Sequence, residues 1–255
     1  MPTVNVPRAY LDNYVAGING IDALGRQALS QALAGADLEN RSRVTAIMRA
    51  HCNATAQAAG ELAAQFYRGM SILQTGEDVE VEALSGWDQT ATDVATNAII
   101  SQAGGDTAKL LRMLLDRESF EVNRASKLGV YNNGKRDQRG VRYARVPSGA
   151  ETCAWCLMTA GLGFWYMTEE SASHSHAHCD CVIVPGIAFT DVVIDGYDSG
   201  ALRDMWREAR RMLEEGDIDP DLMEHILDEA YAKGDEYRID TNGVLAVLRH
   251  YWGLK

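Results

Sequence analysis

Most residues that could bind a metal ion lie in one stretch of this sequence, residues 141 to 185. The stretch holds four of the five cysteines and three of the six histidines, namely Cys153, Cys156, Cys179, Cys181, His174, His176 and His178. A Cys-x-x-Cys pair can present two thiolates to one ion from a single tight turn, and a His-x-x-Cys-x-Cys element can supply the other ligands from a second loop. The spacing therefore indicates a small module organised by a metal ion.

The expected ion is zinc, because mixed thiolate and imidazole ligands favour it. Cys153 and Cys156 come from the first element, and Cys179 and Cys181 from the second, with one of the histidines as a competing ligand. A site with three or four thiolates is closed to substrate, so the predicted zinc is structural. The alternative is that the cysteines are buried without a metal and that the histidines belong to a polar loop.

Motifs of several enzyme classes are missing from the sequence. There is no His-x-Glu before a Pro-Cys-x-x-Cys as in zinc deaminases, no His-Glu-x-x-His, no Gly-x-Ser-x-Gly and no phosphate-binding Gly-rich loop. The helical pattern before the Cys-x-x-Cys also differs from the βαβ context of a thioredoxin-like redox site. We therefore expect a protein that is not an enzyme.

The composition is that of an ordinary globular protein, with 255 residues and 46% hydrophobic content. No apolar run approaches the ~18 residues that span a membrane, and the N-terminus lacks the features of a signal peptide. We expect the protein to be made in the cytosol, where closely spaced cysteines are metal ligands more often than disulfides. Cys52 lies apart within a helical pattern and is expected to be a buried free thiol.

Charge is distributed unevenly along the chain. The net charge is −12, yet residues 124 to 145 contain seven basic residues and one acid, whereas residues 195 to 240 contain fifteen acids and six bases. A basic stretch in an acidic protein suggests a contact with DNA phosphates or with an acidic protein surface. The residues assigned to this contact are Lys135, Arg136, Arg139, Arg142 and Arg145, with Tyr131 and Tyr143 beside them. The alternative is a solvated loop.

Helical periodicity dominates the first half of the chain. The strongest pattern runs from about residue 37 to residue 73, with apolar or small residues at spacings of three and four: Val44, Ile47, His51, Thr55, Ala58, Leu62, Phe66 and Met70. Such a stripe needs a partner, which is another helix of this chain or another subunit. Further helices are expected within residues 1–36, where glycines weaken the pattern, and at residues 88–102 and 107–128, followed by a turn at residues 131–134.

The second half alternates short strands and helices. Strands are expected at residues 141–146, 181–184 and 189–194, and helices at residues 199–213, 220–232 and 244–251. The fold class is therefore mainly α with a small α+β module. We expect a helical bundle with a long helix and a basic loop at its end (residues 1–140), a zinc-ribbon-like Cys/His module (residues 141–196) and an acidic helical tail (residues 197–255).

The Thr-Cys-x-x-Cys element and the later His-x-x-Cys-x-Cys element resemble the MuF-like minor head proteins of tailed bacteriophages, in the actinobacterial subgroup. The resemblance is close over about residues 140 to 186 and general over the helical half. It selects His176, three residues before Cys179, as the histidine that competes with the four cysteines. It implies a structural head-morphogenesis protein of the virion, assembled in the host cytoplasm and attached to the portal inside the head.

Several partners follow from the same resemblance. They are the portal protein, the major capsid protein, packaged DNA that the protein could accompany on ejection, and further copies of this chain, whereas no membrane is expected. Two rival hypotheses remain: a host-encoded, zinc-stabilised nucleic-acid-binding module, and an effector enzyme attached to a MuF-like module. About 60 residues follow the module, which is short for an added catalytic domain.

Overall fold

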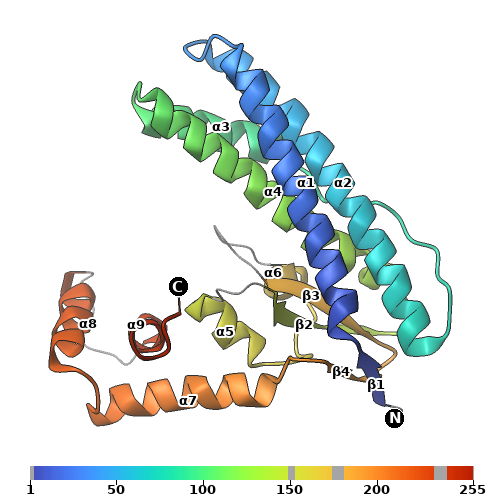
Figure 1. Ribbon diagram of the computed structural model, residues 1–255, viewed down its shortest axis with the longest axis vertical. Coiled ribbons are helices and arrows are strands. Elements are labelled where there is room, and N and C mark those ends of the chain that lie inside the picture. The colour runs from blue at the N-terminus through green and yellow to red at the C-terminus, as the bar shows by residue number, and fades with distance from the viewer. Residues whose placement is uncertain (1–2, 149–152, 174–180, 233–239, 255) are drawn as a thin grey trace.

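The computed structural model of the protein describes residues 3–148, 153–173, 181–232 and 240–254 (Figure 1). Over these residues the chain is mainly helical with two small sheets, which confirms the expected fold class. The helices are α1 (Arg8–Ala34), α2 (Arg41–Thr75), α3 (Gln89–Ala103), α4 (Thr107–Arg136), α5 (Ala154–Ala160), α6 (Glu169–Ser173), α7 (Ser199–Glu215), α8 (Pro220–Ala232) and α9 (Thr241–Trp252). The strands are β1 (Thr3–Val6), β2 (Val141–Pro147), β3 (Cys181–Ile187) and β4 (Asp191–Ile194).

Short polar side chains set the starts of the long helices. Asn40, Asp88 and Asp106 each accept a hydrogen bond from the backbone N three residues later, at 2.9–3.1 Å. These N-caps satisfy backbone donors that have no partner within the helix. The helix α2 therefore begins at Arg41, after Asn40, rather than at the expected Asp37. Asp198, rather than the expected Ser199, caps α7 in the same way.

The helix α2 buries a face that is offset from the predicted stripe. Its most buried small residues include Cys52, Ala56, Ala59 and Ala63, whereas the predicted Ile47, His51, Thr55, Ala58 and Leu62 are half-buried. The reason is that α2 contacts α1, α3 and α4 together, so its buried face is wide. Because Cys52 is fully buried as a free thiol, that expectation is confirmed.

Glycines of α1 allow the close approach of α2, and α1 is one continuous helix despite them. A Cβ atom placed on Gly17 would lie 2.7 Å from Leu62 Cδ2, and one on Gly25 would lie 2.6 Å from Thr55 Cγ2. Both neighbours belong to the predicted stripe of α2. The glycines therefore cost helix propensity but permit tight helix packing at these positions.

The predicted turn at residues 131–134 is wrong, because α4 continues through it to Arg136. Tertiary contacts hold the helix there. The side-chain amide of Asn133 donates to the carbonyl oxygens of Glu82 and Gly129 and accepts from the backbone N of Glu82. Gly134 lies directly against the Tyr143 hydroxyl. Residues typical of a turn are thus used to bind the neighbouring loop and strand.

The two sheets pair segments that lie far apart in the sequence. The strands β2 and β3 are antiparallel, with Ala144 opposite Val184 and Pro147 opposite Cys181. The strands β1 and β4 are parallel, with Val6 opposite Ile194. The strand β1 was not expected, since residues 3–6 carry too short an alternation to stand out from a leading segment.

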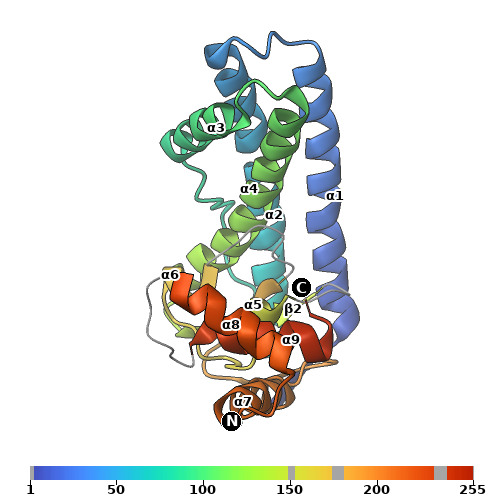
Figure 2. The same cartoon turned by 90° about the vertical axis from the view of Figure 1, so that its left-hand side faces the viewer.

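One hydrophobic cluster runs through the bundle and the β-strands. It includes Tyr14 of α1, Phe66 of α2, Val122 of α4, Ile183 of β3 and Ile194 of β4. A second cluster lies between α1, α2, α3 and α4 at their other end, and a third joins α5 to α7, α8 and α9. Figure 2 shows α7, α8 and α9 gathered at the end of the molecule that holds β2. The domain division remains a prediction, although the first cluster contains residues from both sides of residue 140.

No helix among the described residues is both long and apolar enough to cross a bilayer.

Candidate functional site

Three predicted metal ligands lie together where α5 and β3 begin. Cys153 is the N-cap of α5, and its Sγ accepts a hydrogen bond from the backbone N of Cys156 at 3.2 Å. Cys156 and Cys181 form a buried cluster, and the half-buried Cys153 and Trp155 pack against it. The antiparallel pairing of β2 with β3 places Cys181 opposite Pro147, close to the segment that leads to Cys153. The strands thus bring Cys181 of the second element close to the first element.

The remaining two predicted ligands, His176 and Cys179, lie outside the described residues. Within the described part of the chain, no three His, Cys, Asp or Glu side chains are arranged to hold a metal ion. The complete ligand set therefore stays a prediction from the sequence, and the described geometry concerns Cys153, Cys156 and Cys181.

The largest unexpected feature of this site is Arg145, whose side chain is fully buried. Its Nη2 donates to Cys181 Sγ at 3.0 Å, and its Nη1 donates to the carbonyl oxygen of Ala172 at 3.1 Å. Its guanidinium carbon lies 5.1 Å from the ring centroid of Trp155. In the sequence, Trp155 stands between the two cysteines of the first element. Because Arg145 is inaccessible, its assignment to a DNA or portal contact is wrong.

The chemistry of this cluster suits a soft cation. Cys153 Sγ accepts a hydrogen bond from a backbone N–H, and Cys181 Sγ accepts one from the Arg145 guanidinium. Cysteine is a residue type that zinc prefers as a ligand, so the composition of the cluster suits zinc, while the arrangement of a complete site stays a prediction.

A second basic residue of the predicted contact surface, Arg139, is used inside the molecule. Its guanidinium donates to Ser71 Oγ and Thr75 Oγ1 at 2.9 Å and to Glu77 Oε2 at 2.8 Å, and it also pairs with Asp137. The Arg139 guanidinium, and then the Tyr67 hydroxyl, lower the pKa of Asp137 to about 2. Arg139 therefore joins the end of α2 to the end of α4.

Lys135, Arg136 and Arg142 remain exposed. Arg136 forms an ion pair with Glu82, and the Arg142 guanidinium carbon lies 5.3 Å from the ring centroid of the half-exposed Phe189. These three residues are the part of the predicted basic surface that a partner could reach.

The tyrosines expected beside the basic residues are core residues. Tyr131 and Tyr143 are buried, and the Tyr143 hydroxyl donates to the carbonyl oxygen of Tyr131 at 3.0 Å. In the aromatic run that follows α5, Tyr166 is buried and bonds back to Thr159, whereas Trp165 is 71% exposed. Of this aromatic run, Tyr166 thus packs in the core, whereas Trp165 is exposed to solvent.

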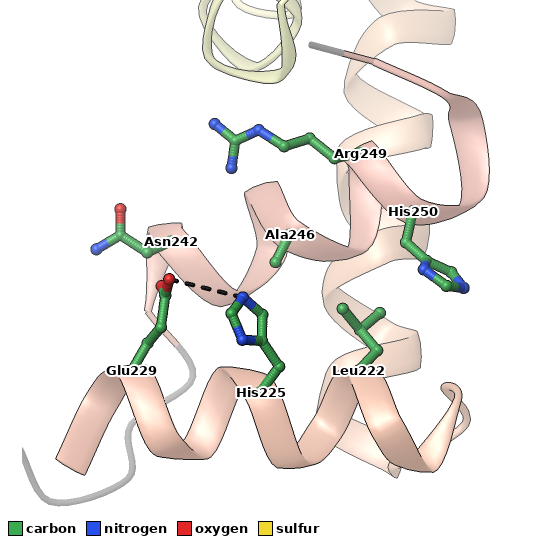
Figure 3. Close-up of a pocket in the computed structure, with 7 residues that line it drawn as sticks. All are labelled: Leu222, His225, Glu229, Asn242, Ala246, Arg249 and His250. Atoms are coloured by element: carbon green, nitrogen blue, oxygen red, sulfur yellow. Dashed lines mark ion pairs between the residues drawn. The ribbon is translucent and has the colours of Figure 1, made fainter. Parts of the chain in front are cut away.

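A cavity of about 420 Å³ lies between α8 and α9 (Figure 3). His225 and Glu229 project from α8 toward Asn242 and Ala246 of α9, and His225 Nε2 lies 3.6 Å from Glu229 Oε1. Both side chains of the pair are more than half exposed, so the pair has the character of a surface contact along one helix rather than of a catalytic site.

Sequence reasoning missed four buried charged residues, Glu118, Glu121, Lys127 and Arg145, although for Glu118 one signal was available. Glu118 falls in the apolar spacing of α4, four residues after Leu114 and four before Val122, and is fully buried with them. Both its carboxyl oxygens lack a hydrogen-bond partner among the described residues. Burial and then the nearby Asp22 raise the pKa of Glu118 to about 7.

Comparison with known proteins covers most of the chain. Residues 5–209 match the sequence pattern of the VG15 protein family, so the match includes both cysteine elements and ends before α8 and α9. The gene 15 protein of Mycobacterium phage D29 is 31% identical over 117 residues, which are 45% of this chain and only 35% of that protein. No solved structure matches. Because the family match extends over well more than half of its residues, this chain belongs to the VG15 family.

Proposed function

We propose that this VG15-family protein is a structural minor head protein of the MuF-like kind, attached to the portal inside the head of a tailed phage. The observation that carries the proposal is the cluster of Cys153 and Cys156 of the first cysteine element with Cys181 of the second. Together these elements are the pattern that resembles MuF-like proteins. The similarity to a protein of a mycobacteriophage supports a phage setting.

In this proposal the Cys/His module binds one structural zinc ion. Cys153, Cys156 and Cys181 would be ligands, with the fourth from His176 or Cys179. The zinc would fix the start of α5 against the start of β3, which lie far apart in the sequence. A role in folding rather than in catalysis is supported by the burial of Cys156 and Cys181, because a closed site offers no position to a substrate.

The proposed docking element is the helical half of the chain. Four large apolar side chains are exposed there, and the most exposed are Leu24 on α1 at 69% and Val94 on α3 at 66%. Deletion of residues 1–75 is a poor test of docking, because it also removes β1, the partner of β4, and ten of the 25 buried residues of the shared core. Surface substitutions separate docking from folding more cleanly.

The proposal is tested by the composition of phage heads. In the phage that encodes this chain, mass spectrometry of purified tailless heads should detect the protein in a fixed ratio to the portal. Leu24→Asp with Val94→Asp should lower incorporation severalfold without changing the melting temperature. The matched control is Val193→Asp on β4, which changes an exposed apolar residue of the other region. A protein abundant in infected cells but absent from heads would contradict the proposal.

A further inference from the structure

We propose that Asp22 of α1 and Glu118 of α4 form a pH-sensitive switch, in which one proton held by the two carboxyl groups keeps the second half of α1 (residues 22–34) closed against α2 and α4. Loss of this proton opens that half of the helix. The switch lies in the helical bundle and is independent of the proposed function, since it involves neither a metal ion nor a partner.

The long helices α1, α2 and α4 meet at the Glu118 side chain. A Cβ atom on Gly25 of α1 would lie 2.8 Å from Glu118 Oε1 and 2.6 Å from Thr55 Cγ2 of α2. Glu118 is fully buried, and neither of its carboxyl oxygens has a hydrogen-bond partner among the described residues. The closest contact between these helices therefore contains a carboxyl group to which no described side chain donates.

A second carboxyl group lies at the same contact. Asp22 stands three residues before Gly25, so the two lie on one face of α1. Asp22 Oδ1 is buried and, within the described part of the chain, also lacks a hydrogen-bond partner. Burial and then the Asp22 carboxylate raise the pKa of Glu118 to about 7. Two carboxylates at one site repel each other, so a proton on one of them removes both the repulsion and a buried charge.

The basic residues nearby are bonded to other partners. Arg26 Nη1 donates to Ser119 Oγ at 2.8 Å and lies 3.5 Å from Asp116 Oδ1, and it lowers the pKa of Glu118 less than burial or Asp22 raises it. Arg117 forms an ion pair with Glu121. The charged and titratable groups of the three helices near this contact are Asp22 and Arg26 on α1, His51 and Cys52 on α2, and Asp116, Arg117 and Glu121 on α4. The charge of an ionised Glu118 is therefore not compensated in the closed state.

The second half of α1 is attached more weakly than the first half. In the first half, the Tyr14 hydroxyl donates to the Ser126 carbonyl oxygen at 3.1 Å, and the Tyr14 and Phe66 rings stack with centroids 4.0 Å apart. Within residues 22–34, all of which are described, Arg26 is the only residue whose side chain hydrogen-bonds to another helix. Leu29 and Leu33 add apolar packing in the second cluster. This half is thus free to move away while the first half stays in place.

Proton release and opening of α1 are coupled. In the closed state, ionisation of Glu118 creates a buried charge without donors beside Asp22, whereas opening admits water that solvates the carboxylate. The closed state keeps the proton up to pH about 7, and a hydrated glutamate releases it near pH 4.5. The closed state is therefore favoured at low pH, and opening becomes easier as pH rises from 4.5 to about 7.

Amide hydrogen exchange of the full chain measures the opening. After correction for the intrinsic pH dependence of exchange, protection of residues 22–34 should fall by about 50- to 100-fold between pH 5 and pH 8. Protection of α9, which belongs to a different cluster, should change much less. Glu118→Gln should abolish the fall, because an amide does not titrate. The matched control is Asp12→Asn, since Asp12 is an exposed residue of the same helix that pairs with Arg8.

A carbon-13 NMR titration of the carboxyl groups tests the role of Asp22. Glu118 should titrate near neutrality in the wild type and at lower pH in Asp22→Asn, because the amide carries no charge that repels the Glu118 carboxylate. The fall in protection of residues 22–34 should move to lower pH in the same variant. Because Asp22 is only half-buried, this variant keeps the test decisive if Glu118→Gln does not fold.

Three results would overturn the switch. One is a Glu118 carboxyl that titrates at the same pH in Asp22→Asn as in the wild type. Another is a wild type in which protection of residues 22–34 falls with pH no more than that of α9. The third is a folded Glu118→Gln that keeps the full fall in protection. None of these results bears on the place of the protein in the phage head, which the composition of purified heads tests separately.

Discussion

Arg145 in the Cys/His module and Glu118 in the bundle are both buried charged residues, and the two regions accommodate them in opposite ways. Arg145 in the module donates to a sulfur and to carbonyl oxygens and stacks on Trp155. Glu118 in the bundle has no hydrogen-bond partner for either carboxyl oxygen among the described residues. Glycine provides its space, since a Cβ on Gly25 would lie 2.8 Å from Glu118 Oε1.

The difference follows from what each group can do with its proton. An arginine stays charged, so its site must supply acceptors. A carboxyl group can become neutral by keeping its proton, and the raised pKa of Glu118, about 7, is that response to burial. The module thus compensates the charge of Arg145, whereas the bundle, which pairs its buried Glu121 with Arg117 and Arg124, also tolerates at Glu118 a carboxyl group that titrates near neutrality.

The largest effect should come from removing a cysteine of the module. Cys153→Ser is expected to lose both bound zinc and cooperative melting, because structural zinc binding contributes on the order of 10 kcal/mol to folding. Elemental analysis and calorimetry measure the two losses. The control is Cys52→Ser in the bundle, which should keep stoichiometric zinc. Equal zinc loss in the two variants, or a wild type that melts cooperatively without metal, would remove the distinction between the two regions.

A smaller effect is expected from Glu118→Gln, and it should depend on pH. The native state keeps the Glu118 proton up to pH about 7, while the unfolded chain releases it near the ordinary value of 4.5. The contribution of Glu118 to stability is therefore full below pH 4.5 and is lost as pH rises to about 7, a change of roughly 3 kcal/mol at most.

Glu118→Gln should flatten this part of the pH dependence and should be more stable relative to the wild type at pH 8 than at pH 5. Urea unfolding at pH 5 and at pH 8 measures this difference in stability. Glu61→Gln on the exposed side of α2 is the control and should leave the pH dependence unchanged. If the free energies of unfolding of Glu118→Gln and of the wild type change in parallel with pH, the cost of burying the charged Glu118 carboxylate is offset by other interactions.

Close packing in the bundle is tested at the contact between α4 and α2. A Cβ on Gly129 would lie 2.6 Å from Ala63 Cβ and 3.3 Å from the Gly60 carbonyl oxygen. Gly129→Ala should therefore destabilise the protein by about 1–3 kcal/mol through overpacking, despite the better helix propensity of alanine. Gly20→Ala on α1 meets no atom within 4 Å and should be neutral or stabilising. Chemical denaturation of both variants decides whether small residues hold the helices together.

The smallest effect on stability is expected at the exposed basic residues where the two regions meet. Neutralising Lys135, Arg136 and Arg142 together should change the free energy of unfolding little, because exposed ion pairs contribute about 0–1 kcal/mol. If these residues bind DNA, the slope of log affinity against log salt concentration should fall by about 0.9 for each phosphate that the variant no longer neutralises. An unchanged affinity and slope would show that the surface is only solvated. Arg139 is left out of this variant because it holds α2 to α4.

Local patterns in the sequence were sufficient for several elements. Short polar residues and glycines mark the ends of α3, and the apolar runs predicted β2 and β3 within a few residues. The spacing of Cys153, Cys156 and Cys181 predicted that they belong to one site. These features depend on backbone hydrogen bonding, side-chain periodicity and ligand spacing, all of which act over short distances along the chain.

Contacts between distant segments decided the rest. The helix α4 continues through Asn132, Asn133 and Gly134 because tertiary contacts hold it there. Asn133 hydrogen-bonds to the loop at Glu82, and Gly134 leaves space for the Tyr143 hydroxyl. The strand β1 forms only because β4, nearly 190 residues later, pairs with it. Arg145 reads in the sequence as one more residue of a basic loop, and its burial arises where β2, β3, α5 and α6 meet. Residue types and their spacing thus determined which ligands and charges this chain contains, whereas packing decided which of its charged side chains are exposed to solvent.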